Sequence, residues 1–78
     1  MAEVLRYLRN GSNRTIEGIS SNTGIGTDIV FNMIRDLEYH QFITVERKDH
    51  ERTVYGLTPS GVRLEQLISE IYNLGAEL

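Results

Sequence analysis

Apolar residues recur at helical spacing from the start of the chain. Leu5 and Leu8 lie three positions apart with Val4 beside them, and residues 2–9 consist mostly of good helix formers. This pattern predicts a short first helix with one apolar face. Gly11 stands just past the last apolar position, where glycine adopts the left-handed conformation that ends many helices.

A second short helix is predicted to begin after Thr15 and to run to about Asn22. Threonine is a common helix cap, and Ile16 and Ile19 are spaced so that both face inward. Gly18 weakens this helix, because glycine in a helix costs about 1 kcal/mol relative to alanine. Either packing must therefore hold this helix, or another part of the protein must approach the backbone closely at Gly18.

The third helix follows the glycine turn Thr23-Gly24-Ile25 and has one apolar and one polar side. It is predicted to begin near Gly26 or Thr27 and to end near His40. Spacings of three and four place four residues on its apolar side: Val30, Met33, Ile34 and Leu37. Five residues fall on its outer side: Thr27, Asp28, Phe31, Asn32 and Arg35. Gln41 stands where a helix-ending glycine is expected, which predicts either strained left-handed backbone or another geometry.

After the third helix the sequence changes from helical to strand character. Residues 42–47 alternate in part and residues 52–57 are rich in strand formers, and the two segments flank a charged tip at 48–51. They are predicted to pair as a hairpin. Thr58-Pro59 then starts a fourth helix, because threonine caps a helix and proline fits its first position.

The fourth helix carries a long apolar stripe. It is predicted to run to about Leu74, with Gly75 as its stop. Six residues recur at intervals close to a heptad: Leu64, Leu67, Ile68, Ile71, Leu74 and Leu78. Because a core of this size needs a shorter stripe, we expect these residues to pair two copies of the chain. The alternative is that the stripe packs only on its own domain.

The composition narrows the class of protein. The 78 residues suffice for one domain, and the absence of cysteine excludes disulfides and thiolate metal sites. Two isolated histidines do not make a zinc site, so no metal or other cofactor is expected. No apolar run approaches the ~20 residues that span a bilayer, and the first ten residues lack a signal-peptide pattern, which predicts a cytoplasmic protein with no membrane partner.

Charge and motifs exclude two further classes. With 8 Lys and Arg against 11 Asp and Glu, the net charge of −3 argues against non-specific coating of nucleic acid. No nucleophile is paired with a base, since Ser60 is explained by the start of the fourth helix, and phosphate-loop and metalloprotease motifs are missing. The chain is therefore not expected to be an enzyme.

The order of these elements resembles the winged helix-turn-helix regulators of the MarR and PadR kind. Three segments carry the resemblance, within roughly residues 14–64: Thr23-Gly24-Ile25, Leu37-Glu38 followed by Phe42-Ile43, and Tyr55-Gly56-Leu57-Thr58-Pro59-Ser60-Gly61. The resemblance implies a mostly α fold with a small β-hairpin: three helices, a two-stranded wing and a long C-terminal helix. Residues 1–58 would form the winged-helix domain, and residues 59–78 a dimerisation helix packed on the same domain.

The resemblance also implies sequence-specific binding of double-stranded DNA by a small homodimeric transcriptional regulator, with no small-molecule ligand evident. In that family the third helix enters the major groove and the wing reaches a flanking minor groove or the backbone. The outer residues of the third helix, Thr27, Asp28, Phe31, Asn32 and Arg35, match the base-facing positions. The wing positions match Arg47, Lys48, His50 and Arg52, and a phosphate contact matches Arg14 and Thr15.

A second function stays open, namely a winged-helix module that binds protein and has weak or no affinity for DNA. The third helix is acidic, and Phe31 stands where the family usually has a small or polar residue. Phe31 is therefore a core residue in a slightly rotated helix, a contact to a thymine methyl, or a protein contact. Arg35 either reaches DNA or pairs with Glu38 or Tyr39 on a solvated face. The wing cations are either DNA contacts or an ordinary charged hairpin edge.

Overall fold

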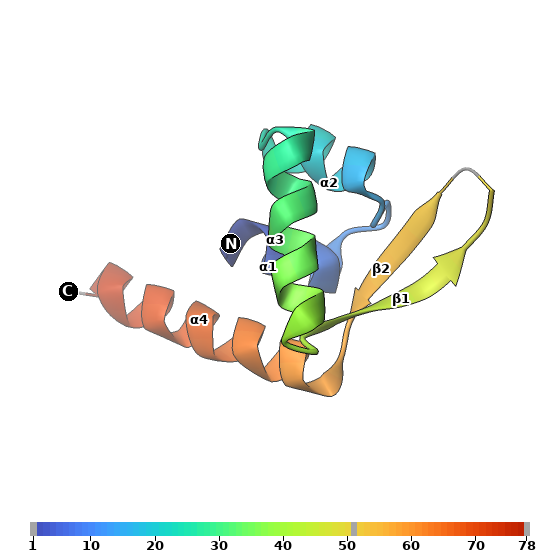
Figure 1. Cartoon of the computed structure of the whole chain (residues 1–78). Helices are drawn as coiled ribbons and strands as arrows, with labels where there is room; N and C mark the ends of the chain where they lie inside the picture. The colour runs from blue at the N-terminus through green and yellow to red at the C-terminus, as the bar shows by residue number, and fades with distance from the viewer. Residues whose placement is uncertain (1, 51, 78) are drawn as a thin grey trace.

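The computed structural model describes the backbone of residues 2–50 and 52–77 and the side chains up to residue 73 within these ranges. Its elements are α1 (Ala2–Asn10), α2 (Ile16–Thr23), α3 (Thr27–Tyr39), β1 (Ile43–Lys48), β2 (Thr53–Leu57) and α4 (Pro59–Glu77). The strands form one antiparallel hairpin that projects from the helices (Figure 1). The predicted fold class, a mostly helical winged helix-turn-helix with a long C-terminal helix, is confirmed.

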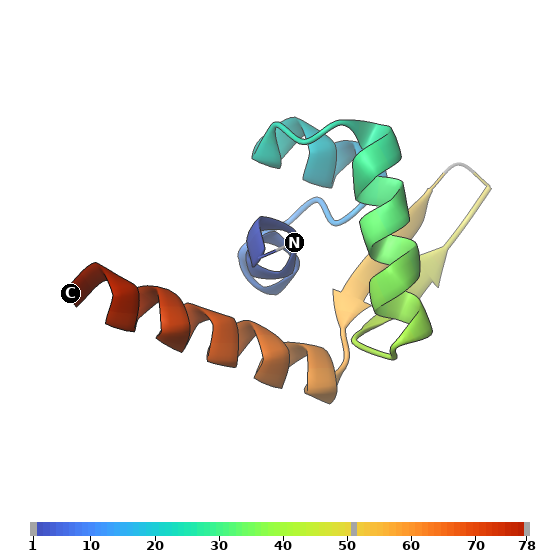
Figure 2. The same cartoon turned by 60° about the vertical axis from the view of Figure 1, so that its left-hand side comes forward.

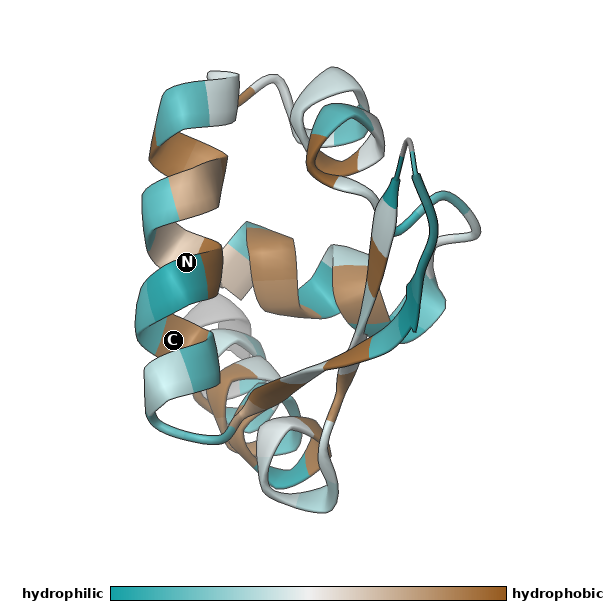
Figure 3. Ribbon diagram, turned by 45° about the vertical axis from the view of Figure 1, so that its right-hand side comes forward, coloured by the Kyte–Doolittle hydropathy of each residue, from teal (hydrophilic) through white to brown (hydrophobic). Residues whose placement is uncertain are grey.

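Helix α1 lies at the centre of the helices. Figure 2 shows it end-on, with α2, α3 and α4 arranged around it. In the ribbon of Figure 3, hydrophobic positions lie mainly on the sides of the helices that face one another, and hydrophilic positions lie on their outer sides and toward the tip of the hairpin. The buried core consists of Val4, Leu5, Leu8, Ile19, Val30, Ile34, Leu37 and Ile43. The apolar spacing in the sequence therefore identified the inner face of each of the first three helices.

The start of α2 explains why a glycine is tolerated inside a short helix. Thr15 caps α2, since its Oγ1 accepts a hydrogen bond from the Gly18 amide at 3.0 Å. A Cβ on Gly18 would overlap the carbonyl oxygen and side chain of Asn13. The close approach that the sequence offered as one explanation for Gly18 is therefore confirmed.

Helix α3 ends in a left-handed residue that is not glycine. Gln41 has φ 64°, and the next amide, that of Phe42, donates to the Leu37 carbonyl at 2.9 Å. The strained left-handed alternative is the one adopted. Thr58, at the start of α4, holds this corner, because its Oγ1 donates to the Gln41 carbonyl at 2.6 Å and its amide to the Phe42 carbonyl at 3.0 Å.

The hairpin contains a bulge that the sequence did not reveal. Val45 pairs with Tyr55 and Arg47 with Val54, so Glu46 is the extra residue on β1. At the tip, the Arg52 amide donates to Asp49 Oδ1 at 2.9 Å, which closes the turn on that side. The bulge changes which residues of β1 lie opposite which residues of β2.

Helix α4 begins as predicted and ends later than predicted. Thr58 Oγ1 accepts from the Gly61 amide at 3.1 Å, which is the expected helix cap. The prediction of Gly75 as the stop is wrong, because α4 continues to Glu77. Glycine lowers helix propensity, but unlike proline it keeps its N–H and so does not interrupt the hydrogen-bond ladder. In the described part of the chain, α4 and the shorter helices all lack the length and apolar character that crossing a membrane requires.

Candidate nucleic-acid interface

The outer side of α3 is open to solvent. All five residues assigned to it from the sequence are exposed: Thr27, Asp28, Phe31, Asn32 and Arg35. Phe31 is 46% exposed, so it is not a core residue, and that alternative is wrong. The phase of the helix is therefore the one that the apolar spacing predicted.

Arg35 lies over the ring of Phe31. Its guanidinium carbon is 5.9 Å from the ring centroid, a distance at which a cation is attracted to the face of an aromatic ring. The two residues are four positions apart, so both lie on the outer side of α3. The sequence suggested that Arg35 either reaches DNA or pairs with Glu38 or Tyr39, and it gave no indication of this contact with Phe31.

A hollow of about 370 Å³ separates the outer side of α3 from the wing. Its lining comes from the start of α2, from α3 and from both sides of the hairpin tip: Ile16, Glu17, Phe31, Lys48, Asp49, His50, Arg52, Thr53 and Tyr55. The tertiary structure therefore brings Phe31 together with three of the four predicted wing residues. The fourth, Arg47, lines a neighbouring hollow of about 400 Å³ with Asp49, His50 and Arg52.

The hollow between α3 and the wing has mixed charge. Lys48 and Arg52 are accompanied by the carboxylates of Glu17 and Asp49, so the surface carries both signs. Burial, and secondarily the Glu38 carboxylate, raise the pKa of the Tyr55 phenol above its ordinary value of 10.0. Tyr55 is therefore a neutral hydrogen-bonding group at neutral pH.

Sequence reasoning missed five of the residues that line this surface: Ile16, Glu17, Asp49, Thr53 and Tyr55. The position of Glu17 could have been inferred from the sequence, because it falls in the first turn of α2, and the start of that helix was predicted correctly. Ile16 was assigned to the inner face of α2 and Asp49 to the charged tip, whereas Thr53 and Tyr55 lie on β2, and their position depends on how the hairpin packs against α3. A single sequence carries no signal for that packing.

Arg14 and Thr15, the predicted phosphate contacts, are both engaged within the protein. Arg14 donates from Nη2 to Glu46 Oε2 at 3.1 Å, and its Nη1 lies 3.0 Å from Oε1 of the same carboxylate. Thr15 is buried and donates its hydroxyl to Asn13 Oδ1 at 3.0 Å while it caps α2. The start of α2 thus faces the wing through Arg14.

The apolar stripe of α4 is divided between two surroundings. Leu64 and Ile68 pack against the core, whereas Leu67 is 51% exposed and Ile71 is 67% exposed. The neighbouring Tyr72 is also exposed. Two further residues assigned to the dimer interface, Leu74 and Leu78, lie outside the side chains that the structure describes.

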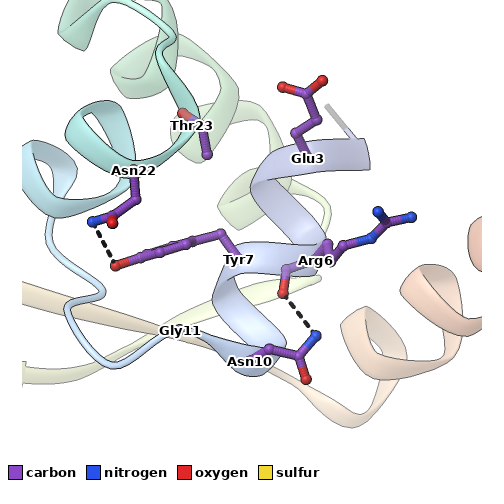
Figure 4. A pocket seen from close by; sticks show the side chains of 7 residues that line it. All are labelled: Glu3, Arg6, Tyr7, Asn10, Gly11, Asn22 and Thr23. Atoms are coloured by element: carbon purple, nitrogen blue, oxygen red, sulfur yellow. Dashed lines mark hydrogen bonds between the residues drawn. The ribbon is translucent and has the colours of Figure 1, made fainter.

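Another hollow lies away from the wing, where α1 meets the end of α2. It measures about 560 Å³, and Figure 4 shows Tyr7 and Asn22 pointing toward each other in it. The Tyr7 hydroxyl donates to the Asn13 carbonyl at 2.8 Å and accepts from Asn22 at 3.2 Å, and Asn22 also donates to the Gly18 carbonyl at 2.8 Å. These polar groups hold α1 and α2 together.

Metal ligands are not gathered anywhere in the residues that the structure describes. Among the side chains that the structure describes, those of residues 2–50 and 52–73, no three from His, Asp and Glu are placed to hold one ion.

A helix that follows a glycine turn, packs against a preceding short helix and is flanked by a two-stranded hairpin is the arrangement of the winged helix-turn-helix class of transcription regulators. The profile of the HxlR-like helix-turn-helix family matches residues 1–78. The chain belongs to that family. No curated protein matches the chain.

Solved structures share this fold. The S. aureus MepR–DNA complex superimposes with a TM-score of 0.85 at 26% identity, over 97% of this chain and 57% of the MepR chain. MepR is a transcription regulator of the multidrug efflux pump MepA. A protein from Archaeoglobus fulgidus superimposes with a TM-score of 0.80 at 21% identity, over 94% of this chain and 84% of that one.

The transcriptional regulator PcaV from Streptomyces coelicolor, in complex with its natural ligand, superimposes with a TM-score of 0.76 at 18% identity, over 83% of this chain and 48% of its own. At such identities the likeness shows the fold alone. The chain spans a little over half the length of MepR.

Proposed function

We propose that this protein is a transcriptional regulator that binds double-stranded DNA, with α3 in the major groove and the wing on the adjacent backbone. The observation that carries the proposal is the hollow in which Phe31 of α3 lies together with Lys48, His50 and Arg52 of the wing. A helix and a wing arranged in this way can contact a groove and its flanking phosphates at once. MepR, at 26% identity, has been solved with DNA.

The exposed residues of α3 have the chemistry for reading bases. Asn32 can form a bidentate pair with adenine, and Asp28 can accept from the amino group of cytosine. Arg35 is exposed and can reach guanine or a phosphate. Phe31 can touch a thymine methyl.

We further propose that two copies act together on DNA. The net charge is −3 and α3 carries Asp28, Asp36 and Glu38, so a single copy has little electrostatic attraction for phosphates. A homodimer paired through α4 presents two wings to one duplex. The expected half-sites lie about 34 Å apart, one turn of DNA, or a multiple of that.

The test is a titration with random-sequence duplex at several salt concentrations. Binding is expected at ~50 mM salt and should weaken steeply as salt rises, because phosphate contacts release counterions. Replacing Arg47 and Lys48 together by alanine should weaken binding to all sequences and flatten the salt slope by about one unit for each lost phosphate contact. Arg63→Ala, an exposed cation on α4, is the matched control and should leave the slope unchanged. An unchanged salt slope in the double variant would show that Arg47 and Lys48 of the wing do not contact DNA phosphates.

A protein-binding module is the second candidate. It is favoured by the exposure of two large apolar residues on α3, Ile29 at 49% and Phe31 at 46%. Such residues on a helix of acidic character fit an assembly surface as well as a DNA-reading one. Failure of the protein to bind random duplex at ~50 mM salt, where phosphate contacts are strongest, would support this candidate and exclude the first.

A further inference from the structure

Glu46 occupies an unusual place on the wing. It is the bulge residue of β1, outside the regular pairing of the hairpin. A bulge redirects the side chain that it carries, and such residues commonly have a specific task. The structure shows where this side chain goes.

The Glu46 side chain crosses β2 above Gly56. A Cβ on Gly56 would collide with the Glu46 carboxylate, so any other residue at position 56 would push that carboxylate away. Gly56 is buried, whereas the two strand residues before it are half-buried. The bulge in β1 and the glycine in β2 therefore both make room for the Glu46 side chain in this position.

The carboxylate ends on Arg14, just before α2. Both terminal nitrogens of Arg14 lie within 3.1 Å of the two carboxylate oxygens, which is the bidentate geometry in which arginine holds a carboxylate most firmly. The Arg14 backbone takes part as well, since its carbonyl accepts from the Tyr55 amide on β2 at 2.9 Å. Arg14 is thus bonded to both strands of the wing.

We propose that the Arg14–Glu46 pair is a positioning device that fixes the wing relative to α2 and α3, and that Arg14 acts through Glu46 and not by holding a phosphate. The inference rests on the proposed DNA binding for its functional consequence. Arg47 and Lys48 directly follow Glu46, so the pair fixes the part of β1 that carries them. The position of the wing cations then depends on a residue of negative charge.

Whether Glu46→Gln raises or lowers the affinity for DNA distinguishes a positioning role of Glu46 from simple competition between Glu46 and DNA for Arg14. Glu46→Gln removes a negative charge next to the wing, which by electrostatics alone would raise affinity for DNA. Positioning predicts the opposite, a loss of affinity for random duplex of up to about fivefold, which corresponds to the ~1 kcal/mol that a partly exposed ion pair contributes at most. Arg14→Ala should weaken binding to a similar extent, and the double variant Arg14→Ala/Glu46→Gln should be no weaker than the single ones.

Glu17→Gln is the matched control. Glu17 is an exposed carboxylate in the hollow between α3 and the wing, and its removal should strengthen binding modestly. If Glu46→Gln instead strengthens binding as Glu17→Gln does, Glu46 only competes with DNA for Arg14, and the proposal is overturned.

Amide hydrogen exchange of the protein without DNA tests the device independently of its function. Glu46→Gln and Arg14→Ala should both speed exchange of the Tyr55 amide, which is bonded to the Arg14 carbonyl, and leave that of Phe42, bonded to Leu37, unchanged. Unchanged exchange at Tyr55 would overturn the proposal. If the unsubstituted protein does not bind DNA, the proposed function is excluded. The positioning role of the pair still holds in that case if the two variants speed exchange of the Tyr55 amide as expected.

Discussion

Gln41 adopts a backbone conformation that favours glycine. Its φ of 64° lies in the left-handed region, where the Cβ of an L residue crowds the following carbonyl at a cost of roughly 1–2 kcal/mol. The conformation persists because the Phe42 amide bonds to Leu37 and the Gln41 carbonyl bonds to Thr58. The corner between α3 and β1 is thus held by its surroundings against a local preference.

Gln41→Gly is expected to stabilise the protein. Glycine relieves the crowding, although part of the gain is offset by the greater freedom of glycine in the unfolded chain. The free energy of unfolding should rise by about 0.5–1 kcal/mol, as measured by urea denaturation. Gln41→Ala keeps the Cβ and serves as the control, with little or no gain expected. A loss of stability on introducing glycine would contradict the account of strain at this corner.

Helices α1 and α4 are joined by a charged group in a buried position. Glu65 of α4 is only 5% exposed, and its carboxylate accepts from Arg9 of α1 and, at 2.8 Å, from the Ser69 hydroxyl. The Arg9 hydrogen bond is the main reason that the pKa of Glu65 is lowered from its ordinary value of 4.5; the Ser69 hydrogen bond adds to it, and burial opposes both. This pair links α1 to α4 beside the apolar contacts of Leu64 and Ile68.

The lowered pKa makes the α1–α4 contact sensitive to acid. A carboxyl group with a lower pKa in the folded state adds stability above its ordinary value of 4.5, and this stability is lost as the pH falls through the lowered pKa. Glu65→Gln should cost about 1–2 kcal/mol at pH 7 and have a smaller effect in acid. Urea denaturation at pH 7 and at about pH 3 measures the difference. Glu70→Gln, an exposed site on the same helix, should show no such pH-dependent loss.

At the scale of the whole molecule, α4 presents apolar side chains for which the described residues provide no cover. Its inner residues Leu64 and Ile68 pack against the core, while Leu67, Ile71 and Tyr72 are exposed. The C-terminal part of α4 extends away from the other helices (Figure 1). Exposed apolar residues grouped in this way mark interaction surfaces. We expect a second copy of the chain to cover them, so that two recognition helices act on one duplex.

Ile71→Asp should separate the proposed dimer into monomers. The buried carboxylate would disfavour pairing, and the loss of apolar burial adds to the effect. Sedimentation equilibrium should show the mass of a dimer for the unsubstituted protein and of a monomer for the variant, with an unchanged thermal midpoint at low concentration. Gln66→Asp, an exposed polar site on the same helix, should remain dimeric. A monomeric mass for the unsubstituted protein at high concentration would exclude pairing through α4.

The sequence determined the elements and their inner faces. Apolar spacing placed Leu5, Leu8, Ile34 and Leu37 in the core, and cap chemistry at Thr58 placed the start of α4, because both signals act between residues a few positions apart. The same local physics identified the outer side of α3. The family resemblance supplied the order of the elements in space and the role of the hairpin as a wing.

Only the tertiary structure decided how charged residues are paired. Arg14 meets Glu46 across 32 positions of sequence and Arg9 meets Glu65 across 56, so in each case two distant segments have to fold together before the partners meet. The same holds for the division of the α4 stripe, since Leu64 and Ile71 have the same character and differ only in what the fold places beside them. Local sequence determines which face of its element a side chain occupies, whereas the partner of that side chain depends on packing between elements. For this reason Arg14, which the family resemblance suggested as a phosphate contact, is bonded to Glu46 of the wing.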